Sequence, residues 1–280
     1  MQGDRERRDS WLRMAYEVDE DAVNAVLLTQ AELQLADGER EQALASLTRL
    51  LESQPKHPQA LRLLAELRHE EQNWTALSEL LPSLRKLPNL SREQLESWTI
   101  DTGVGLLGQP DLDRAAIDSH WQSLPRTLRK ARPLQRARIR SLVRVNAIAE
   151  ADKEIRQALR KEWDEELVPQ YGEIERPDAA KHLSTLEGWL RKRPEDPGLL
   201  LAAGRACMRN KLWGKARSYL ESSLAARPDP MAYNVLGQLM LQLGDGDGAT
   251  DAFRRGLTMG YTGSPEVPRL TADPEPAADS

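Results

Sequence analysis

Small and large residues recur at a fixed offset in the last third of the chain. A shift of 33 residues places Gly204 on Gly237 and Leu220 on Phe253. Small residues in one helix let a second helix approach closely, and large residues in the second helix fill the groove between them. The period therefore predicts successive units of two antiparallel helices, each unit about 34 residues long.

A second copy of this pattern lies near the N-terminus. Trp74 and Trp213 share one position of the period, just after the turn between the two helices of a unit. The slots of the repeat are filled in this copy by Ala31, Gly38, Ala43, Leu47, Pro55 and Ala65. This is the tetratricopeptide pattern, and it predicts an all-α fold, a TPR-like α-solenoid of antiparallel helix pairs with an irregular helical middle section.

The middle of the chain, residues 91–149, carries a less regular helical pattern. Ser91 and Gln94 resemble a capping box at a helix start, and Pro110 is expected to end that helix. Apolar residues at helical spacing predict a further helix over residues 134–149.

Two more helices are predicted over residues 152–163 and 180–194. The stretch between them, residues 164–178, contains Pro169, Gly172 and Pro177 and is expected to leave the helical conformation.

These patterns divide the chain into four parts. Residues 1–90 form an N-terminal repeat block that begins inside a repeat, because residues 10–22 take the slot of a second helix without its partner. Residues 91–178 form the irregular section, and residues 179–262 form a C-terminal repeat block. Residues 263–280 contain four prolines and little to bury, so a disordered tail is expected.

Composition supports the helical assignment and excludes several classes of protein. Hydrophobic residues make up 40% and aromatic residues only 5%, which favours helices over strands. The single cysteine, Cys207, excludes a disulfide framework within the chain and a cysteine-rich metal site. The net charge of -5 argues against nucleic acid as a partner. No apolar window is long enough to span a membrane, so this chain is expected to be soluble.

Two motifs match known sites only by their letters. Residues 103–108 read GVGLLG, but a helical pattern precedes them and Gln109-Pro110 follows, so we interpret them as a helix-packing site and not as a dinucleotide loop. Asp245 and Asp247 lack the further ligands of a calcium loop. We expect no metal site, no catalytic residues and no enzyme activity. Cys207 is expected to be a buried thiol, with a reactive thiol beside Arg205 and Arg209 as the alternative.

One segment is strongly basic in a chain that is acidic overall. Residues 119–149 contain no acidic side chain, and a positive field there can attract an anionic partner or a porphyrin. The alternative is a basic face neutralised by acidic residues elsewhere in the fold. The predicted basic patch consists of Arg126, Arg129, Lys130, Arg136, Arg140 and Arg144.

A second candidate surface follows from the repeat register. The first helices of successive units line the concave face that receives a peptide or a partner helix in TPR proteins. Two arginines beside two amides can hold a carboxylate by charge-assisted hydrogen bonds, although ordinary surface polarity is the alternative. The residues projected onto this face are Arg62, Glu66, His69, Glu70, Arg205, Arg209, Asn234 and Gln238.

The order of the helix-breaking segments resembles that of the HemY-type TPR proteins associated with haem biosynthesis in Gram-negative bacteria. The similarity covers roughly residues 11–260. It rests on His57-Pro58, Trp74, Leu80-Leu81-Pro82, Trp121, Leu124-Pro125, the basic helix, and an extended Leu167-Val168-Pro169 segment before the last repeats.

The resemblance implies a function and a location. Such proteins carry two N-terminal membrane spans before a TPR region, are anchored in the inner membrane, and are assigned to a late step of protohaem synthesis. They have no settled catalytic residues, so none is transferred. We expect this chain to be a soluble fragment of such a protein, on the cytoplasmic side, with no cofactor unless haem binds as a ligand.

Four functions follow from these observations. The leading one is a scaffold or accessory protein that binds haem-biosynthetic enzymes. The first alternative is a haem or porphyrin carrier that uses the basic patch, and the second is a TPR adaptor unrelated to haem. An enzyme acting late in the pathway is the least favoured, because no acid–base constellation is visible.

Overall fold

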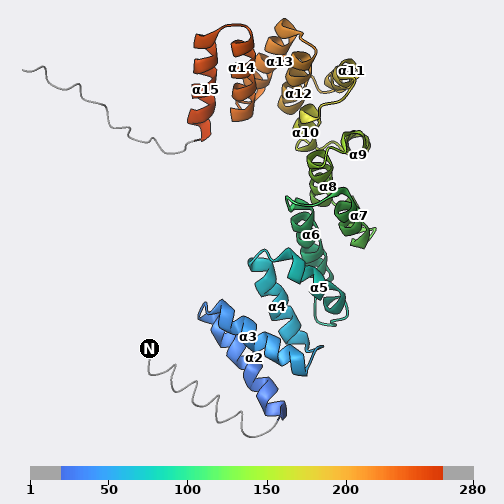
Figure 1. Ribbon diagram of the computed structural model, residues 1–280, viewed down its shortest axis with the longest axis vertical. Coiled ribbons are helices and arrows are strands. Elements are labelled where there is room, and N and C mark those ends of the chain that lie inside the picture. Colours follow the sequence, from blue (N-terminus) through green and yellow to red (C-terminus); the bar gives the residue numbers. More distant parts are fainter. Residues whose placement is uncertain (1–19, 261–280) are drawn as a thin grey trace, which may run out of the picture. The chain divides into compact units, whose positions relative to one another are not determined.

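In a computed structural model, which describes residues 20–260, the chain forms helices joined by turns and short loops (Figure 1). Those residues contain no strand. The predicted partial repeat at residues 10–22 lies outside this range except for its last three residues, which begin α2. The predicted tail at residues 263–280 also lies outside it.

The described part of the chain divides into two compact units, one up to Glu154 and one from Ile155 onward. The first unit contains α2 (Glu20–Ala36), α3 (Arg40–Ser53), α4 (Pro58–Glu70), α5 (Trp74–Leu84), α6 (Arg92–Gly108), α7 (Arg114–Ser123), a short 3-10 helix (Leu128–Lys130), α8 (Arg132–Arg144) and the start of α9 (Ile148–Lys161). The second contains the rest of α9, α10 (Leu167–Glu173), α11 (Ala179–Leu190), α12 (Pro197–Arg209), α13 (Trp213–Ala226), α14 (Pro230–Gln242) and α15 (Gly246–Gly260).

Five of the described helix pairs are joined by the same turn, in which a residue with positive φ follows the first helix. One residue later, a backbone N–H bonds to a carbonyl oxygen five residues earlier, as from Asn73 to Arg68 and from Leu212 to Cys207, both at 2.9 Å. This is the Schellman motif. The left-handed residues are Gly38, Gln72, Asn146, Lys211 and Gly244, with φ of 78°, 54°, 58°, 58° and 79°.

The repeat register predicted from the sequence is confirmed by packing inside the last two pairs. A Cβ atom on Gly204 of α12 would lie 2.7 Å from Leu220 of α13, and one on Gly237 of α14 would lie 2.6 Å from Phe253 of α15. Each small residue therefore faces the large residue that the period assigns to it. The fold is the all-α, TPR-like solenoid of helix pairs that the pattern predicts.

From α2 to α6, neighbouring helix pairs share their apolar side chains. One cluster contains Leu27 and Ala31 of α2, Leu47 and Leu50 of α3, and Ala60 and Leu64 of α4. A second cluster contains Leu61 and Ala65 of α4, Leu77, Leu81 and Leu84 of α5, and Trp98 of α6. Helix α4 contributes to both clusters, so the apolar interior continues from α2 to α6.

Several predicted helix boundaries are confirmed. Helix α6 begins after Ser91, whose hydroxyl accepts a hydrogen bond from the Gln94 backbone at 3.1 Å, and ends at Gly108 before Pro110. Trp74 and Trp213 each begin the second helix of a pair.

Two other predictions in the middle section are wrong. The helix expected over residues 134–149 is interrupted after Arg144, because Asn146 takes the left-handed conformation and forms the turn between α8 and α9. Residues 164–178 do not stay outside the helical conformation, and Leu167-Val168-Pro169 is not extended, because α10 forms there. Pro169 is tolerated because it lies in the first turn of α10, where the backbone N–H has no partner within the helix.

The four-part division of the chain stays a prediction. Its first boundary falls between α5 and α6, and its second falls immediately before α11. The section predicted to be irregular contains the α8–α9 turn, which has the same geometry as the turns of the repeat blocks.

Candidate functional site

The predicted concave-face residues of α4 bind one another or the neighbouring helices. Arg62 Nε donates to Glu66 Oε1 at 3.0 Å within α4, and both side chains are partly exposed. Glu70 accepts a hydrogen bond from Arg40 at the start of α3, also at 3.0 Å. Arg62 and Glu66 thus remain on the surface as an ion pair, and Glu70 ties α4 to α3.

His69 connects α4 to the next helix pair. Its Nε2 atom lies 2.9 Å from Asp101 Oδ2 on α6. The imidazole meets the Trp74 ring edge-on at 5.7 Å between centroids and lies 6.5 Å from the Trp98 ring. His69 is therefore part of the contact between two repeats, with about one third of its side chain exposed.

The two predicted arginines of α12 point to α10. Arg205 pairs with Glu173 at 2.9 Å, and Arg209 donates to the Gly172 carbonyl oxygen at 2.6 Å. Burial lowers the pKa of Arg209 from its ordinary value. A Cβ atom on Gly172 would lie 2.6 Å from Ala202, so the backbone of α10 lies directly against α12 at this point.

The two predicted amides of α14 remain on the surface. Gln238 donates to Asn234 Oδ1 at 2.8 Å, and both residues are exposed. Among residues 20–260, the structure gives no contact between these amides and Arg205 or Arg209. A carboxylate site made from all four residues stays a prediction.

Two members of the predicted basic patch hold backbone carbonyls. Arg129 donates to the Leu124 and Gln122 oxygens at 3.0 and 2.8 Å. Arg144 of α8 donates to the Leu107 and Gly108 oxygens at 3.0 and 3.3 Å. Arg144 thereby caps the C-terminus of α6, where a cation is favoured by the helix dipole.

The other members of the patch differ in exposure. Arg136 is half-buried and takes part in an interaction. Arg126, Lys130 and Arg140 are exposed. Three members of the basic patch are therefore left exposed to an anion, and we call Arg126, Lys130 and Arg140 the exposed basic group.

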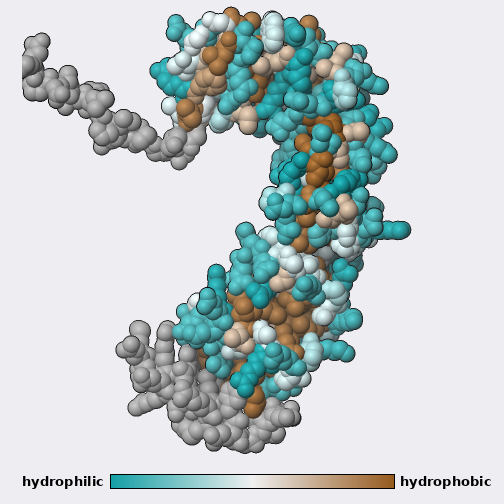
Figure 2. All heavy atoms as spheres, viewed as in Figure 1, coloured by the Kyte–Doolittle hydropathy of each residue, from teal (hydrophilic) through white to brown (hydrophobic). Residues whose placement is uncertain are grey.

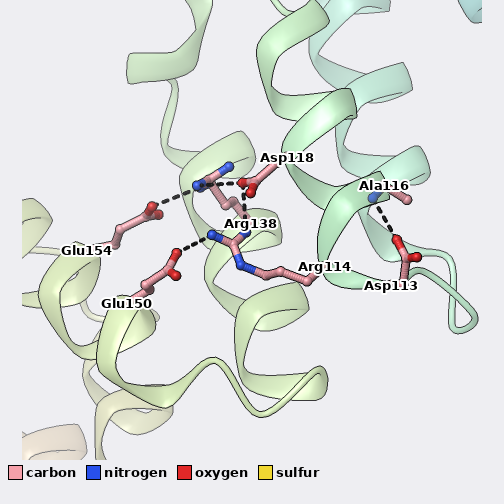
Figure 3. Close-up of polar contacts among 7 residues, drawn as sticks. All are labelled: Asp113, Arg114, Ala116, Asp118, Arg138, Glu150 and Glu154. Atoms are coloured by element: carbon pink, nitrogen blue, oxygen red, sulfur yellow. Dashed lines mark hydrogen bonds and ion pairs between the residues drawn. The ribbon is translucent and has the colours of Figure 1, made fainter.

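A charge network that the sequence analysis missed lies beside this segment (Figure 3). Arg114 of α7 pairs with Asp118 at 2.7 Å and also with Glu150 of α9. Arg138 of α8 pairs with Glu154 at 2.8 Å and with Asp118 at 3.3 Å. The five side chains alternate in sign, so carboxylates from α7 and α9 neutralise part of the basic segment.

Arg138 is the most buried member of the network, with 9% of its side chain exposed. Its guanidinium also lies 4.8 Å from the ring centroid of Trp121, a favourable cation–π distance. One signal in the sequence could have found it. Arg138 shares a helix face with Leu134 and Leu142, and a charged residue on an apolar face needs partners.

Cys207 is a buried thiol, as predicted. None of its surface is exposed, and burial raises its pKa to about 11. It therefore stays protonated at neutral pH, and the alternative of a reactive thiolate is not supported.

The glycine-rich motifs have structural roles. Residues 103–108 lie inside and at the end of α6, and a Cβ atom on Gly103 would lie 2.6 Å from Leu134. Asp245 accepts a hydrogen bond from the Gly248 backbone at 2.9 Å at the start of α15. No group of three or more His, Cys, Asp or Glu side chains within residues 20–260 could hold a metal ion.

None of the helices in residues 20–260 combines the length and the apolar character needed to cross a bilayer.

Comparisons with known proteins agree with the repeat pattern. The model of the tetratricopeptide repeat family TPR_16 matches residues 28–76 and 201–263. Protein HemY of Escherichia coli strain K12 is 24% identical over 265 residues, which cover 94% of this chain and 67% of that protein. Protein HemY of Shigella flexneri matches with the same identity and coverage.

Two solved structures are similar to most of this chain at low sequence identity. The Cut9–Hcn1 hetero-tetramer of the APC/C is 15% identical, with a TM-score of 0.45, and covers 85% of this chain and 60% of that chain. TTC0263, a TPR protein of Thermus thermophilus, is 19% identical with a TM-score of 0.28 and covers 84% of this chain and 90% of that chain.

Proposed function

Because the chain is a tetratricopeptide-repeat protein of the HemY type, we propose that it is an accessory protein of late protohaem biosynthesis that binds other proteins. In this proposal the helix pairs form a scaffold whose surface side chains contact haem-biosynthetic enzymes. The surfaces offered are the exposed basic group and the exposed polar residues of α4 and α14.

The observation that carries the proposal is the separation of packing residues from surface residues. Apolar residues fill the interior from pair to pair, while Arg126, Lys130 and Arg140 are left exposed in a chain of net charge -5. Exposed cations in an acid-free segment of an acidic protein favour a partner with an acidic surface and speed its association.

Charge reversal of the exposed basic group tests this proposal. The chain with Lys130→Glu/Arg140→Glu would be compared with the unaltered chain for binding to purified ferrochelatase and protoporphyrinogen oxidase. Arg191→Glu/Lys192→Glu is the matched control, because both residues are exposed in the second unit and carry the same charge. We expect the first variant to lose at least tenfold in affinity and the control to bind normally.

Equal binding by both variants would contradict the role of the exposed basic group. No binding of either enzyme by the unaltered chain would contradict the scaffold role with these enzymes. Turnover of a porphyrin substrate by the purified chain alone would contradict a function without catalysis.

The second candidate function is direct binding of haem or another porphyrin. It is favoured by the same three cations, because porphyrin propionates are carboxylates that arginine and lysine can bind. Titration of haem into the purified chain distinguishes the candidates. A saturable shift of the Soret band that is lost in Lys130→Glu/Arg140→Glu supports a carrier, and no shift supports the scaffold.

We also propose that the HemY-type parent is anchored in the inner membrane with the repeat region in the cytoplasm. Protection of the repeats from protease added to spheroplasts is the expected result. Digestion before lysis would place the region on the opposite side.

A further inference from the structure

Three of the four histidines have a role in holding the fold together. A ring nitrogen of His57 caps the start of α4. His69 pairs with Asp101 of the next helix pair. His182 is completely buried, and its ring centroid lies 4.6 Å from that of Tyr171. The contacts of these three imidazoles therefore account for their presence.

The fourth histidine, His120, is half-buried in the last turn of α7. Within residues 20–260 the structure gives its imidazole no hydrogen bond or ion pair. A neutral imidazole is a common ligand of iron, including the iron of haem. A porphyrin supplies the other ligands of its iron, so one histidine is sufficient to bind it.

Two cations of the exposed basic group lie in the loop that follows α7. Arg126 and Lys130 are exposed, and Arg129 between them donates to two backbone carbonyl oxygens at the end of α7. These bonds hold the loop against the end of α7 that carries His120. A ligand for iron and two cations that can bind carboxylates therefore belong to the same end of one helix.

The nearest acidic residue along the chain is neutralised by other side chains. Asp118 pairs with Arg114 and Arg138 (Figure 3). It precedes His120 by two positions, which is about 200° around a helix, so the two side chains leave α7 on opposite sides. An anionic ligand at His120 therefore meets the cations of its own segment and not this carboxylate.

The surface over α7 is mostly hydrophilic (Figure 2). A porphyrin on such a surface makes few apolar contacts. Its binding therefore depends on the bond to iron and on the bonds to its propionates, and loss of either is expected to lower the affinity strongly.

We infer that His120 is the axial ligand of an iron porphyrin whose propionates are bound by Arg126 and Lys130. The inference rests on the second candidate function, direct porphyrin binding, and specifies its ligand. A ring nitrogen of the histidine gives its lone pair to the iron, with no change in oxidation state. The chain therefore prefers haem to the iron-free porphyrin, and the reaction that supplies its ligand is the insertion of iron into a porphyrin.

Titrations of the full chain with ferric haem and with iron-free protoporphyrin IX test this inference. The Soret band reports the binding of haem, and porphyrin fluorescence reports the binding of the iron-free compound. We expect the unaltered chain to bind haem at least tenfold more tightly. His120→Asn is expected to lower the affinity for haem at least tenfold and to leave the affinity for protoporphyrin IX unchanged.

His57→Asn is the matched control for the histidine. His57 is half-buried like His120, and asparagine is also a good N-cap, so α4 keeps its cap. This variant is expected to bind both porphyrins as the unaltered chain does. If His120→Asn loses helix content by circular dichroism, His120→Ala is the second variant, and added imidazole is expected to restore its haem spectrum.

Arg126→Glu/Lys130→Glu tests the contacts with the propionates. It is expected to lower the affinity for both porphyrins at least fivefold, because haem and protoporphyrin IX carry the same propionates. The control is again Arg191→Glu/Lys192→Glu, which is expected to bind both porphyrins normally.

Two results would overturn the inference and leave porphyrin binding intact. One is equal affinity of the unaltered chain for haem and protoporphyrin IX. The other is haem binding by His120→Asn that equals haem binding by His57→Asn. No binding of either porphyrin by the unaltered chain would contradict the second candidate function itself.

Discussion

The indole of Trp74 on α5 lies against the backbone of Gly105 on α6, so closely that a Cβ atom on Gly105 would lie 2.2 Å from the ring. Trp74 also contacts His69, so α4, α5 and α6 meet at one point. Glycine is required at position 105 because the indole ring occupies the space of a Cβ atom. The backbone of Gly105 does not have a positive φ, so conformational freedom is not the reason.

Gly105→Ala is expected to lower the free energy of unfolding by about 1–3 kcal/mol, because the added methyl group must displace the indole ring. Gly108→Ala is the control, since no atom lies within 4 Å of the Cβ position there. Urea denaturation followed by circular dichroism measures both variants. Equal stability of the two would contradict the close contact.

Arg138→Ala is expected to lower the free energy of unfolding by about 2 kcal/mol. It removes a buried guanidinium and leaves Asp118 and Glu154 with fewer cationic partners. The partial exposure of both carboxylates keeps the expected loss below that of a fully buried pair. Arg92→Ala, which removes an exposed pair with Glu96, is expected to cause no measurable change in the same denaturation assay.

The left-handed turn residues allow two predictions of opposite sign for the free energy of unfolding. Lys211→Gly is expected to raise the free energy of unfolding by about 0.5 kcal/mol, because glycine adopts a φ of 58° without a steric penalty. Gly244→Ala is expected to lower it by about 1 kcal/mol for the converse reason. Thermal denaturation of both variants checks the turn geometry. A stabilising Gly244→Ala would contradict it.

Cys207 makes stability depend on alkaline pH. Because the pKa of its thiol is raised to about 11 in the folded chain, the unfolded chain loses this proton first as the pH rises above 9.0. The stabilising contribution is full below pH 9.0 and is lost between pH 9.0 and about 11, by roughly 2–3 kcal/mol.

The control for this prediction is Cys207→Ala. The cavity that this substitution leaves lowers the free energy of unfolding by the same amount at every pH. The difference in unfolding free energy between the two chains is therefore expected to shrink as the pH rises from 8 to 11. A constant difference would show that the thiol titrates normally in the folded state.

The sequence was sufficient for the helix pairs and insufficient for the contacts between them in the middle section. The 33-residue offset identifies Gly204 and Leu220 because their close packing requires fixed residue sizes. The α8–α9 turn was missed because neither glycine nor proline marks it, and Asn146 adopts the left-handed conformation without such a signal.

The candidate site was less predictable than the fold. The acid-free segment indicated a basic surface, and the structure leaves only part of it exposed. The pairing of Arg138 with Asp118 and Glu154 depends on how α7 and α9 pack around α8, which periodicity along one helix does not specify. Arg205 and Arg209 were placed on the correct helix, but their contacts with α10 depend on a helix that the prolines of residues 164–178 concealed.

The recurring Schellman turn also has a consequence for how such a chain can change in length. Each turn closes a hairpin by bonds that stay within a few residues of it, and the spacing from one turn to the next is 34 residues at Gly38 and Gln72 and 33 at Lys211 and Gly244. A duplication or deletion of one whole hairpin would join a first helix to the same kind of neighbour as before. Homologous chains that differ in size are therefore expected to differ by whole hairpins, with the junctions in the loops between pairs.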